Sequence, residues 1–263
     1  MRIYWSILAF CSVIIIWVFF PVIQKTKLNS EAMKNPEIIA HRGASSVAPE
    51  NTLASVQKGY EGGAGFIEVD VRLTADNRPV LMHDEKLDRT TNSTAFLSDL
   101  LFEDVRLLDA GSWFSDDYKG EAVPYLEEVI CLIKGKAKLL IEIKDYGCID
   151  SCVYLINKYN AFDWCWVQAF DDDVLERIHT MDTRVRLIKL LIGKWKFLPL
   201  QFDSGLNYFS FNKYSFLKGF AIHHRFAGQH FVNWAHKRNM LVFAWTLDDT
   251  RRAKKLRKRG IDG

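Results

Sequence analysis

Short apolar runs separated by longer amphipathic segments recur from residue 37 to the end of the chain. The runs occupy residues 37–40, 66–71, 79–82, 139–143, 164–169, 185–191, 219–222 and 241–245. Several runs are continuous rather than alternating in polarity, which is typical of strands that are covered on both faces. Strands that alternate with helices over this length predict an α/β domain, either a closed parallel barrel or an open doubly wound sheet.

The connection between the second and third runs does not fit a regular barrel. Only residues 72–78 separate them, whereas a crossover between parallel strands needs about a dozen residues or more. We therefore expect these two runs to form a β-hairpin, which leaves seven parallel strands. Polar residues cluster at the carboxyl ends of several runs, where barrel active sites are built, and this placement favours the barrel.

The N-terminus carries a separate apolar segment. Residues 3–23 contain no charged side chain and lie between Arg2 and Lys25. As a helix, this segment is about 30 Å long and matches the hydrocarbon core of a bilayer. It lacks the small residues of a signal-peptide cleavage site, so we favour an uncleaved single-pass membrane anchor over a cleaved signal peptide. The expected organisation is an anchor at 1–24, a linker at 25–36 and a barrel domain at 37–263, with the membrane orientation left open.

The formal net charge of +3 is unevenly distributed along the chain. Residues 251–259 contain seven basic side chains, so the rest of the chain has a net charge of −4. A negative body argues against a nucleic-acid-binding protein. We interpret the basic stretch as the solvated face of an outer helix, with contact to anionic lipid headgroups as the alternative. Five scattered cysteines without a CxxC pair indicate neither a zinc module nor a disulfide framework.

Three carboxylates fall on two of the predicted strands. Glu68 and Asp70 are two positions apart in one run, so both side chains face the same cavity. Glu142 offers a third carboxylate near the end of another run, and Lys144 shares its face. Carboxylates on one face repel each other unless a cation or a proton lies between them, and hard oxygen ligands favour magnesium, calcium or manganese over zinc. We therefore expect a divalent metal ion, with Mg²⁺ or Ca²⁺ preferred.

Two histidines and an arginine accompany these carboxylates. His41 closes the first run and Arg42 follows it. A histidine titrates near neutral pH, and an arginine can fork onto phosphate. The predicted hairpin places His83 close to opposite Asp70. A lone histidine at a strand end is more often a satisfied polar residue than a catalyst, but this combination at neighbouring strand ends indicates a site that acts on phosphate.

An ordered series of motifs resembles the glycerophosphodiester phosphodiesterase family over residues 37–263. The motifs are HRG with PENT, EVDVRLTAD, PVLMHD with LDRTT, LLDAGSWF with VPYLEEV, LIEIK, QAF and AWTLDD. The resemblance implies an α/β fold, a modified (β/α)8 TIM-type barrel. The eighth strand of such a barrel would begin at Gly260-Ile-Asp-Gly263, where the chain ends, so the barrel could be open and lack its last strand.

The resemblance also implies a role for each of seven residues that are intact in this chain. They are the metal ligands Glu68, Asp70 and Glu142, the acid–base pair His41 and His83, and the phosphate contacts Arg42 and Lys144. The implied activity is metal-dependent hydrolysis of glycerophosphodiesters to glycerol 3-phosphate and an alcohol, in lipid metabolism.

Two other functions stay open. The predicted anchor places the domain where lysophospholipids concentrate, so lysophospholipase D activity at the membrane is the first alternative. Trp245, at the end of the last run, is a candidate substrate contact, with a core tryptophan as the competing interpretation. A membrane-tethered barrel that binds phosphodiesters without cleaving them is the second alternative, and the complete set of acid–base residues and ligands disfavours it.

Overall fold

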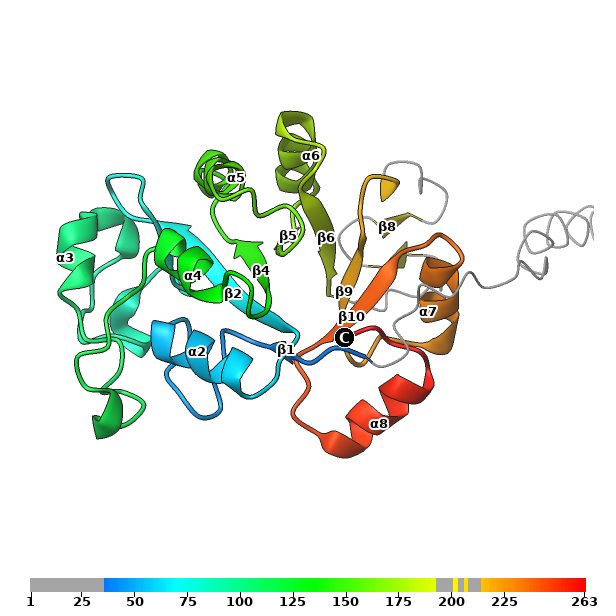
Figure 1. Ribbon diagram of the computed structural model, residues 1–263, viewed down its shortest axis with the longest axis horizontal. Coiled ribbons are helices and arrows are strands. Elements are labelled where there is room, and N and C mark those ends of the chain that lie inside the picture. The colour runs from blue at the N-terminus through cyan, green and yellow to red at the C-terminus, as the bar shows by residue number, and fades with distance from the viewer. Residues whose placement is uncertain (1–35, 193–200, 203–205, 208–213) are drawn as a thin grey trace, which may run out of the picture. The chain divides into compact units, whose positions relative to one another are not determined.

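The computed structural model describes residues 36–192, 201–202, 206–207 and 214–263 (Figure 1). Its main sheet has seven parallel strands in the order β1-β2-β4-β5-β6-β9-β10, and β3 pairs with β2 at one side. The strands are β1 (Ile39–Ala40), β2 (Phe66–Leu73), β3 (Pro79–Leu81), β4 (Lys138–Ile143), β5 (Cys165–Ala169), β6 (Arg186–Leu191), β9 (Gly219–His223) and β10 (Leu241–Trp245). Each predicted apolar run is therefore a strand of this sheet. A second, antiparallel pair is formed by β7 (Gln201–Phe202) and β8 (Leu206–Asn207).

Helices connect most of the parallel strands. They are α2 (Leu53–Glu61), α3 (Phe102–Arg106), α4 (Leu126–Ile133), α5 (Cys148–Lys158), α6 (Asp172–Met181), α7 (Gln229–His236) and α8 (Thr250–Lys258). Local capping sets where several of them begin. Thr52 accepts the backbone N–H of Ser55 at the start of α2, while Asp171 and Asp249 cap α6 and α8 in the same way. Three short 3-10 helices, Leu87–Arg89, Leu97–Asp99 and Asp116–Tyr118, lie with α3 in the segment between β3 and β4.

The strands β2 and β3 form the predicted hairpin. Val71 pairs with Leu81, and Leu73 pairs with Pro79, in antiparallel register. The hairpin is possible because Asn77 in the turn adopts a left-handed conformation, with a φ of 59°. After β3, the backbone N–H of Met82 donates to the carbonyl oxygen of Asp70 at 3.0 Å. The residue that follows Met82 is His83, so the hairpin delivers this histidine to the strand that carries Asp70.

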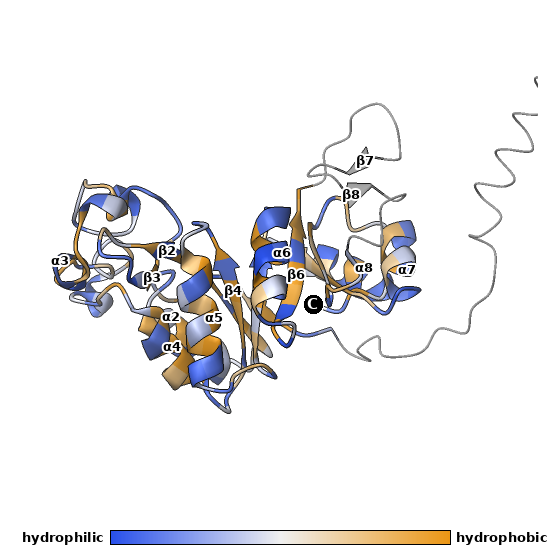
Figure 2. Ribbon diagram, turned by 90° about the horizontal axis from the view of Figure 1, so that it is seen from above, coloured by the Kyte–Doolittle hydropathy of each residue, from blue (hydrophilic) through white to orange (hydrophobic). Residues whose placement is uncertain are grey.

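Alternation along the strands separates two hydrophobic cores. Every second side chain points inside the curl of the sheet, and the buried members of this inner core are Phe66, Leu140, Trp166, Ile188, Leu190, Ala221 and Phe243. The intervening positions, such as Ile67, Val69 and Ile141, pack in a larger outer core with the helices. Figure 2 shows hydrophobic colour along the strands and hydrophilic colour on parts of the helices. Strands covered on both faces explain why the apolar runs are continuous.

The sheet curls in the manner of a (β/α)8 barrel but stays open between β10 and β1, which are its two edge strands. The last residues of the chain lie in this seam. The backbone N–H of Asp262 donates to Val242 at 2.9 Å, and the carbonyl oxygen of Gly263 accepts from Ala244 at 2.9 Å. On the other side, the N–H of Glu37 donates to the carbonyl oxygen of Asp262 at 2.8 Å. The chain therefore ends where the resemblance places the start of the eighth strand.

The predicted membrane anchor at residues 3–23 lies outside the described residues, and the same is true of the linker up to residue 35. Within the described ranges, the helices are all too short or too polar to cross a bilayer. The anchor therefore stays a prediction from the sequence.

Candidate active site

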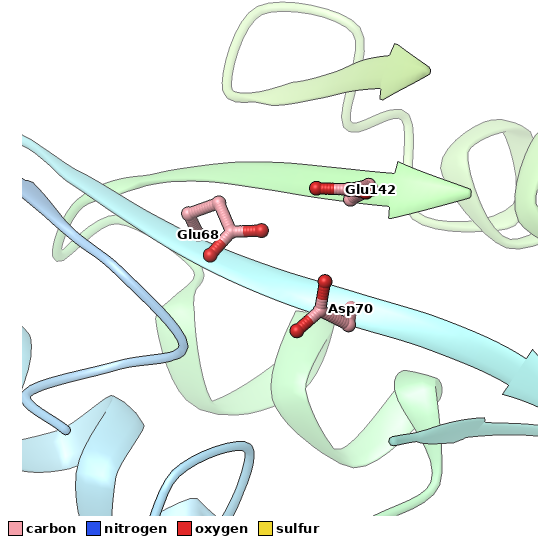
Figure 3. A group of neighbouring side chains, drawn as sticks. All are labelled: Glu68, Asp70 and Glu142. Carbon is pink, nitrogen blue, oxygen red and sulfur yellow. The ribbon is translucent and has the colours of Figure 1, made fainter. Parts of the chain in front are cut away.

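Three buried carboxylates lie close together on the neighbouring strands β2 and β4 (Figure 3). Asp70 pairs with Glu142 in the parallel register of these strands, and Glu68 lies two positions before Asp70 on the same face. One oxygen atom from each of the three groups lies within 4.8 Å of the others. Their residues are only 3 %, 1 % and 7 % exposed for Glu68, Asp70 and Glu142. The fold therefore brings together the three carboxylates that we expected from the sequence to lie in one site.

Crowding and burial shift the proton affinities of these carboxylates. Burial raises the pKa of Glu68 well above its ordinary value, and the charges of Asp70 and Glu142 raise it further. Burial and Asp70 also raise the pKa of Glu142. Burial alone would raise the pKa of Asp70, but Lys144 and Arg42 hold it below its ordinary value. The fold thus crowds three carboxyl groups together, and burial together with this crowding raises the pKa values of Glu68 and Glu142.

This donor set fits a hard divalent cation. Mg²⁺ and Ca²⁺ bind oxygen ligands at about 2.0–2.6 Å, so two oxygens bound to one ion are at most about 5 Å apart. The oxygens of Glu68, Asp70 and Glu142 meet this condition. A cation between them would also relieve the repulsion that raises the pKa of Glu68.

Two cationic side chains flank the carboxylates. The guanidinium of Arg42 lies 3.2 Å from Oδ2 of Asp70 and donates to Glu50 at 2.9 Å. The ammonium of Lys144 lies 3.1 Å from Oδ1 of Asp70 and donates to Glu142. Burial would lower the pKa of Lys144, but these carboxylates raise it above its ordinary value, so the ammonium stays charged.

The backbone of Arg42 shapes this side of the site. Arg42 adopts a φ of 56°, in the left-handed region that few residues other than glycine occupy. In this conformation its backbone N–H donates to Oε2 of Glu68 at 2.8 Å. The same turn lets the hydroxyl of Ser55 donate to the carbonyl oxygen of Arg42 at 3.0 Å, which ties the turn to α2. One hydrogen bond from the N–H of Arg42 and one to its carbonyl oxygen thus hold this residue in its left-handed conformation.

The two histidines have different surroundings. His41 is partly buried at the end of β1, and burial followed by the charge of Arg42 lowers its pKa below the ordinary value of 6.5. Nδ1 of His83 lies 2.6 Å from Oδ1 of Asp84, and this carboxylate also accepts from Arg89 at 2.5 Å. The neutral imidazole of His41 is therefore suited to accept a proton, whereas the contact with Asp84 fixes the orientation of the His83 ring.

A cavity of about 1090 Å³ joins these groups. Its charged side includes six of the seven expected residues, namely His41, Arg42, Glu68, His83, Glu142 and Lys144. Much of its apolar lining, Phe170, Leu190, Phe243 and Trp245, comes from the second half of the chain, and Ile39 and Leu140 add to it from β1 and β4. The indole N–H of Trp245 donates to Ala221 at 3.0 Å, and the ring meets Phe170 edge-on with centroids 5.8 Å apart. Trp245 therefore lines the cavity and is anchored in the inner core at the same time.

Sequence reasoning assigned no role to three residues that contact the site. Asn51 hydrogen-bonds Asp70, Asp84 contacts His83, and Gln168 on β5 places its Nε2 3.4 Å from both Glu68 and Glu142. The available signals were their places in the PENT, PVLMHD and QAF motifs. Four histidines nearer the C-terminus, His223, His224, His230 and His236, take no part in the acidic cluster.

Comparison with known proteins agrees with this geometry. Residues 41–263 match the model of the glycerophosphoryl diester phosphodiesterase family. The chain is 33 % identical over 230 residues to YhdW of Bacillus subtilis, which covers 86 % of this chain and 92 % of the relative. It is also 33 % identical over 236 residues to a glycerophosphodiester phosphodiesterase of Caldanaerobacter subterraneus, covering 86 % and 91 % of the two chains.

Solved structures show the same fold. A phosphodiesterase of Oleispira antarctica, in complex with its product sn-glycerol-3-phosphate, superposes with a TM-score of 0.76 at 27 % identity, covering 87 % of this chain and 91 % of that one. A glycerophosphodiester phosphodiesterase of Agrobacterium tumefaciens superposes with a TM-score of 0.72 at 25 % identity, covering 86 % and 94 %. The chain belongs to the glycerophosphoryl diester phosphodiesterase family.

Proposed function

We propose that the protein hydrolyses glycerophosphodiesters to glycerol 3-phosphate and an alcohol in a metal-dependent reaction. The observation that carries this proposal is the shared cavity, in which a cluster of three carboxylates, two imidazoles and two cationic side chains converge. A phosphodiester anion needs its negative charge offset, a proton acceptor on one side and a proton donor on the other. Each requirement has a matching side chain here.

The metal ligands in this proposal are Glu68, Asp70 and Glu142, and the ion is Mg²⁺ or Ca²⁺. When bound, a divalent cation offsets the charge that grows on the phosphoryl oxygens in the transition state. Asn51 and Gln168 orient the ligand carboxylates through the hydrogen bonds described above. Oxygen-only donors support a hard cation over zinc.

The histidines divide the proton transfers. His41, neutral because its pKa is lowered, accepts the proton of the attacking hydroxyl group or water. His83, whose Nδ1 faces Asp84, donates a proton to the oxygen of the departing alcohol. Arg42 and Lys144 bind the phosphate oxygens, and their ion pairs with Asp70 hold them at the metal ligands.

The test follows glycerol 3-phosphate and choline released from glycerophosphocholine by the purified full-length chain in neutral detergent. We expect release with Mg²⁺ or Ca²⁺, none with chelator, and loss of orders of magnitude in Glu142→Gln. Glu103→Gln, at an exposed position of α3, is the matched control and should keep full activity. A folded protein that releases neither product with either ion would contradict the proposal.

Lysophospholipids are a second candidate substrate, favoured by the apolar side of the cavity. The cavity volume of about 1090 Å³ is at the upper limit of the roughly 300–1,000 Å³ of pockets for drug-sized ligands, so it exceeds the needs of a small headgroup. Ala244 and Leu256 continue the lining toward the seam between β10 and β1. If an acyl chain binds there, Ala244→Phe should lower choline release from lysophosphatidylcholine much more than release from glycerophosphocholine. Equal effects on the two substrates would count against this candidate.

For the cellular location, we propose that residues 3–23 form an uncleaved membrane anchor, that 25–36 link it to the enzyme, and that 37–263 are the catalytic domain. The support is the uncharged 21-residue length of this segment, which suits a bilayer. Full-length protein should stay in the membrane fraction after alkaline carbonate extraction, whereas a chain cleaved near residue 24 should be released. An N-terminal sequence of the mature protein that begins after residue 23 would exclude the anchor.

A further inference from the structure

Helix α8 carries a stripe of basic side chains on its solvent face. Arg251, Lys254, Lys255 and Lys258 are spaced i, i+3, i+4 and i+7, and all four are exposed. This spacing places them on one side of the helix. Leu256, the buried residue of α8, lies on the opposite side. The helix is therefore amphipathic, and we call its solvent side, made by these four residues, the basic face.

The basic face makes no ion pair with any residue that the structure describes. In the ranges that the structure describes, none of its four side chains lies within salt-bridge distance of a carboxylate. Two exposed lysines elsewhere in the molecule do form ion pairs. Lys158 donates to Glu127 at 2.5 Å, and Lys86 donates to Asp88 at 2.7 Å. In the described part of the chain, exposed lysines such as Lys119 and Lys134 form no ion pair either, so the distinguishing feature of α8 is that four such charges gather on one helix face.

This arrangement works against the stability of the helix itself. Like charges three and four positions apart repel each other along a helix. Arg251 and Arg252 also lie in the first turn, where the helix dipole disfavours positive charge, although the capping carboxylate of Asp249 lies beside them at this helix start. Sequences commonly depart from helix-stabilising charge patterns at functional positions, where binding of a partner compensates the lost stability. The expected partner is an anionic surface.

The charge of the rest of the chain narrows the choice of partner. Outside residues 251–259 the net charge is −4, so an extended polyanion is repelled by most of the molecule and attracted at α8. Single-stranded nucleic acids are usually held by aromatic side chains beside the basic ones, and residues 250–259 contain no aromatic residue. A bilayer surface is flat and contacts the protein on one side, so the basic face of a single helix is enough to bind it.

We propose that the basic face of α8 docks on anionic lipid headgroups, as a second membrane contact beside the anchor proposed for residues 3–23. A tethered domain meets the bilayer at a high effective concentration, so weak electrostatic docking is sufficient. Helix α8 begins shortly after Trp245, which ends β10 and lines the cavity. Docking through α8 therefore holds the catalytic domain close to the lipid surface.

The test compares amide hydrogen exchange of full-length protein in nanodiscs of phosphatidylcholine alone and of phosphatidylcholine mixed with phosphatidylglycerol. We expect exchange of residues 250–258 to slow several-fold in the anionic nanodiscs at low ionic strength and to recover at high salt. A triple variant, Lys254→Gln, Lys255→Gln and Lys258→Gln, should lose this protection. The matched control removes three exposed lysines elsewhere, Lys119→Gln, Lys134→Gln and Lys218→Gln, and should keep it.

Several outcomes would overturn the proposal. Equal exchange of α8 in the two lipid compositions would show that the basic face does not meet anionic lipid. Loss of protection in the control variant as well would assign the effect to total charge rather than to α8. Protection by a single-stranded oligonucleotide in neutral nanodiscs, without protection by phosphatidylglycerol, would assign the basic face to nucleic acid. None of these readouts depends on enzymatic activity.

Discussion

Asn51 holds Asp70 through both ends of its carboxamide. Nδ2 of Asn51 donates to Oδ2 of Asp70 at 2.9 Å, and its Oδ1 accepts the backbone N–H of Asp70 at 3.1 Å. Asn51 is 4 % exposed and has a φ of 55°, a left-handed conformation that asparagine adopts more readily than most residues. The carboxylate of Asp70 is therefore fixed in direction before any ligand binds.

Loss of the two hydrogen bonds between Asn51 and Asp70 should weaken metal binding. We expect Asn51→Ala to lower the affinity for Mg²⁺ or Ca²⁺ by about 10- to 100-fold, because partners that orient ligands contribute that much to metal sites. Activity should recover in part at high metal concentration. The measurement is a calorimetric titration of metal into chelator-treated protein. Asn77→Ala, which also removes a left-handed asparagine but in the β2–β3 turn, serves as control, and the same affinity in wild type and Asn51→Ala would refute the assignment.

Loss of His41 should affect turnover rather than folding. His41→Ala removes the proposed proton acceptor, which typically lowers kcat by about 10²–10⁴-fold. Because His41 is only partly buried at a strand end, we expect little change in the thermal unfolding midpoint. The check combines steady-state kinetics on glycerophosphocholine with a melting curve. His179→Ala on α6, where the ring stacks on Phe216, controls for loss of an imidazole, and a fully active His41→Ala would exclude the role.

The pH dependence of kcat/KM should report the environment of His41. Its lowered pKa means that the imidazole stays neutral, and able to accept a proton, below pH 6.5. The acidic limb of the profile should therefore have its midpoint below that pH. Arg42→Gln removes a charge that lowers this pKa, so the remaining activity should show the limb at a higher pH. An acidic midpoint at or above pH 6.5 in wild type would contradict the assignment.

Stabilisation by metal should grow with pH. In the metal-free protein the pKa values of Glu68 and Glu142 are raised by burial and by neighbouring carboxylates, so the folded chain binds more protons than the unfolded chain above about pH 4.5. The stability of the metal-free protein is therefore reduced as pH rises through these folded pKa values. Metal binding requires ionised ligands, so it must displace the protons at low pH.

We therefore expect the rise in melting temperature on adding Mg²⁺ or Ca²⁺ to be larger at pH 8 than at pH 5.5. Melting curves with metal and with chelator at the two pH values measure this difference. Comparison of the two curves at each pH separates the metal effect from other titrating groups. Glu68→Gln should lose most of the increment at both pH values, and an increment that is independent of pH would contradict the assigned ligands.

The fold could be predicted from the sequence because its signals are local. Continuous apolar runs marked the strands, and the seven-residue gap between the second and third runs could hold only a turn. The shared face of Glu68 and Asp70 followed from strand periodicity, since residues two positions apart share a face. The position of His83 beside the strand of Asp70 followed from the hairpin. These relationships each span few residues.

The supporting contacts could not be predicted in this way because they join distant segments. Asn51 is 19 residues from Asp70, and Gln168 is 100 residues from Glu68. An uncharged amide follows no charge pattern, and only the order and register of the strands bring Gln168 between its two partners. The roles of Asn51 and Gln168 therefore emerge from the folded geometry.

The cavity draws its two sides from different parts of the chain. All of the ionisable groups proposed for the reaction lie between residues 41 and 144, whereas the large apolar lining residues Phe170, Leu190, Phe243 and Trp245 come from later in the chain. Substitutions at these four apolar positions leave the ionisable groups of the proposed reaction unchanged. They should therefore alter which leaving groups fit in the cavity at constant chemistry. A combinatorial library at the four apolar positions should sample these leaving groups directly.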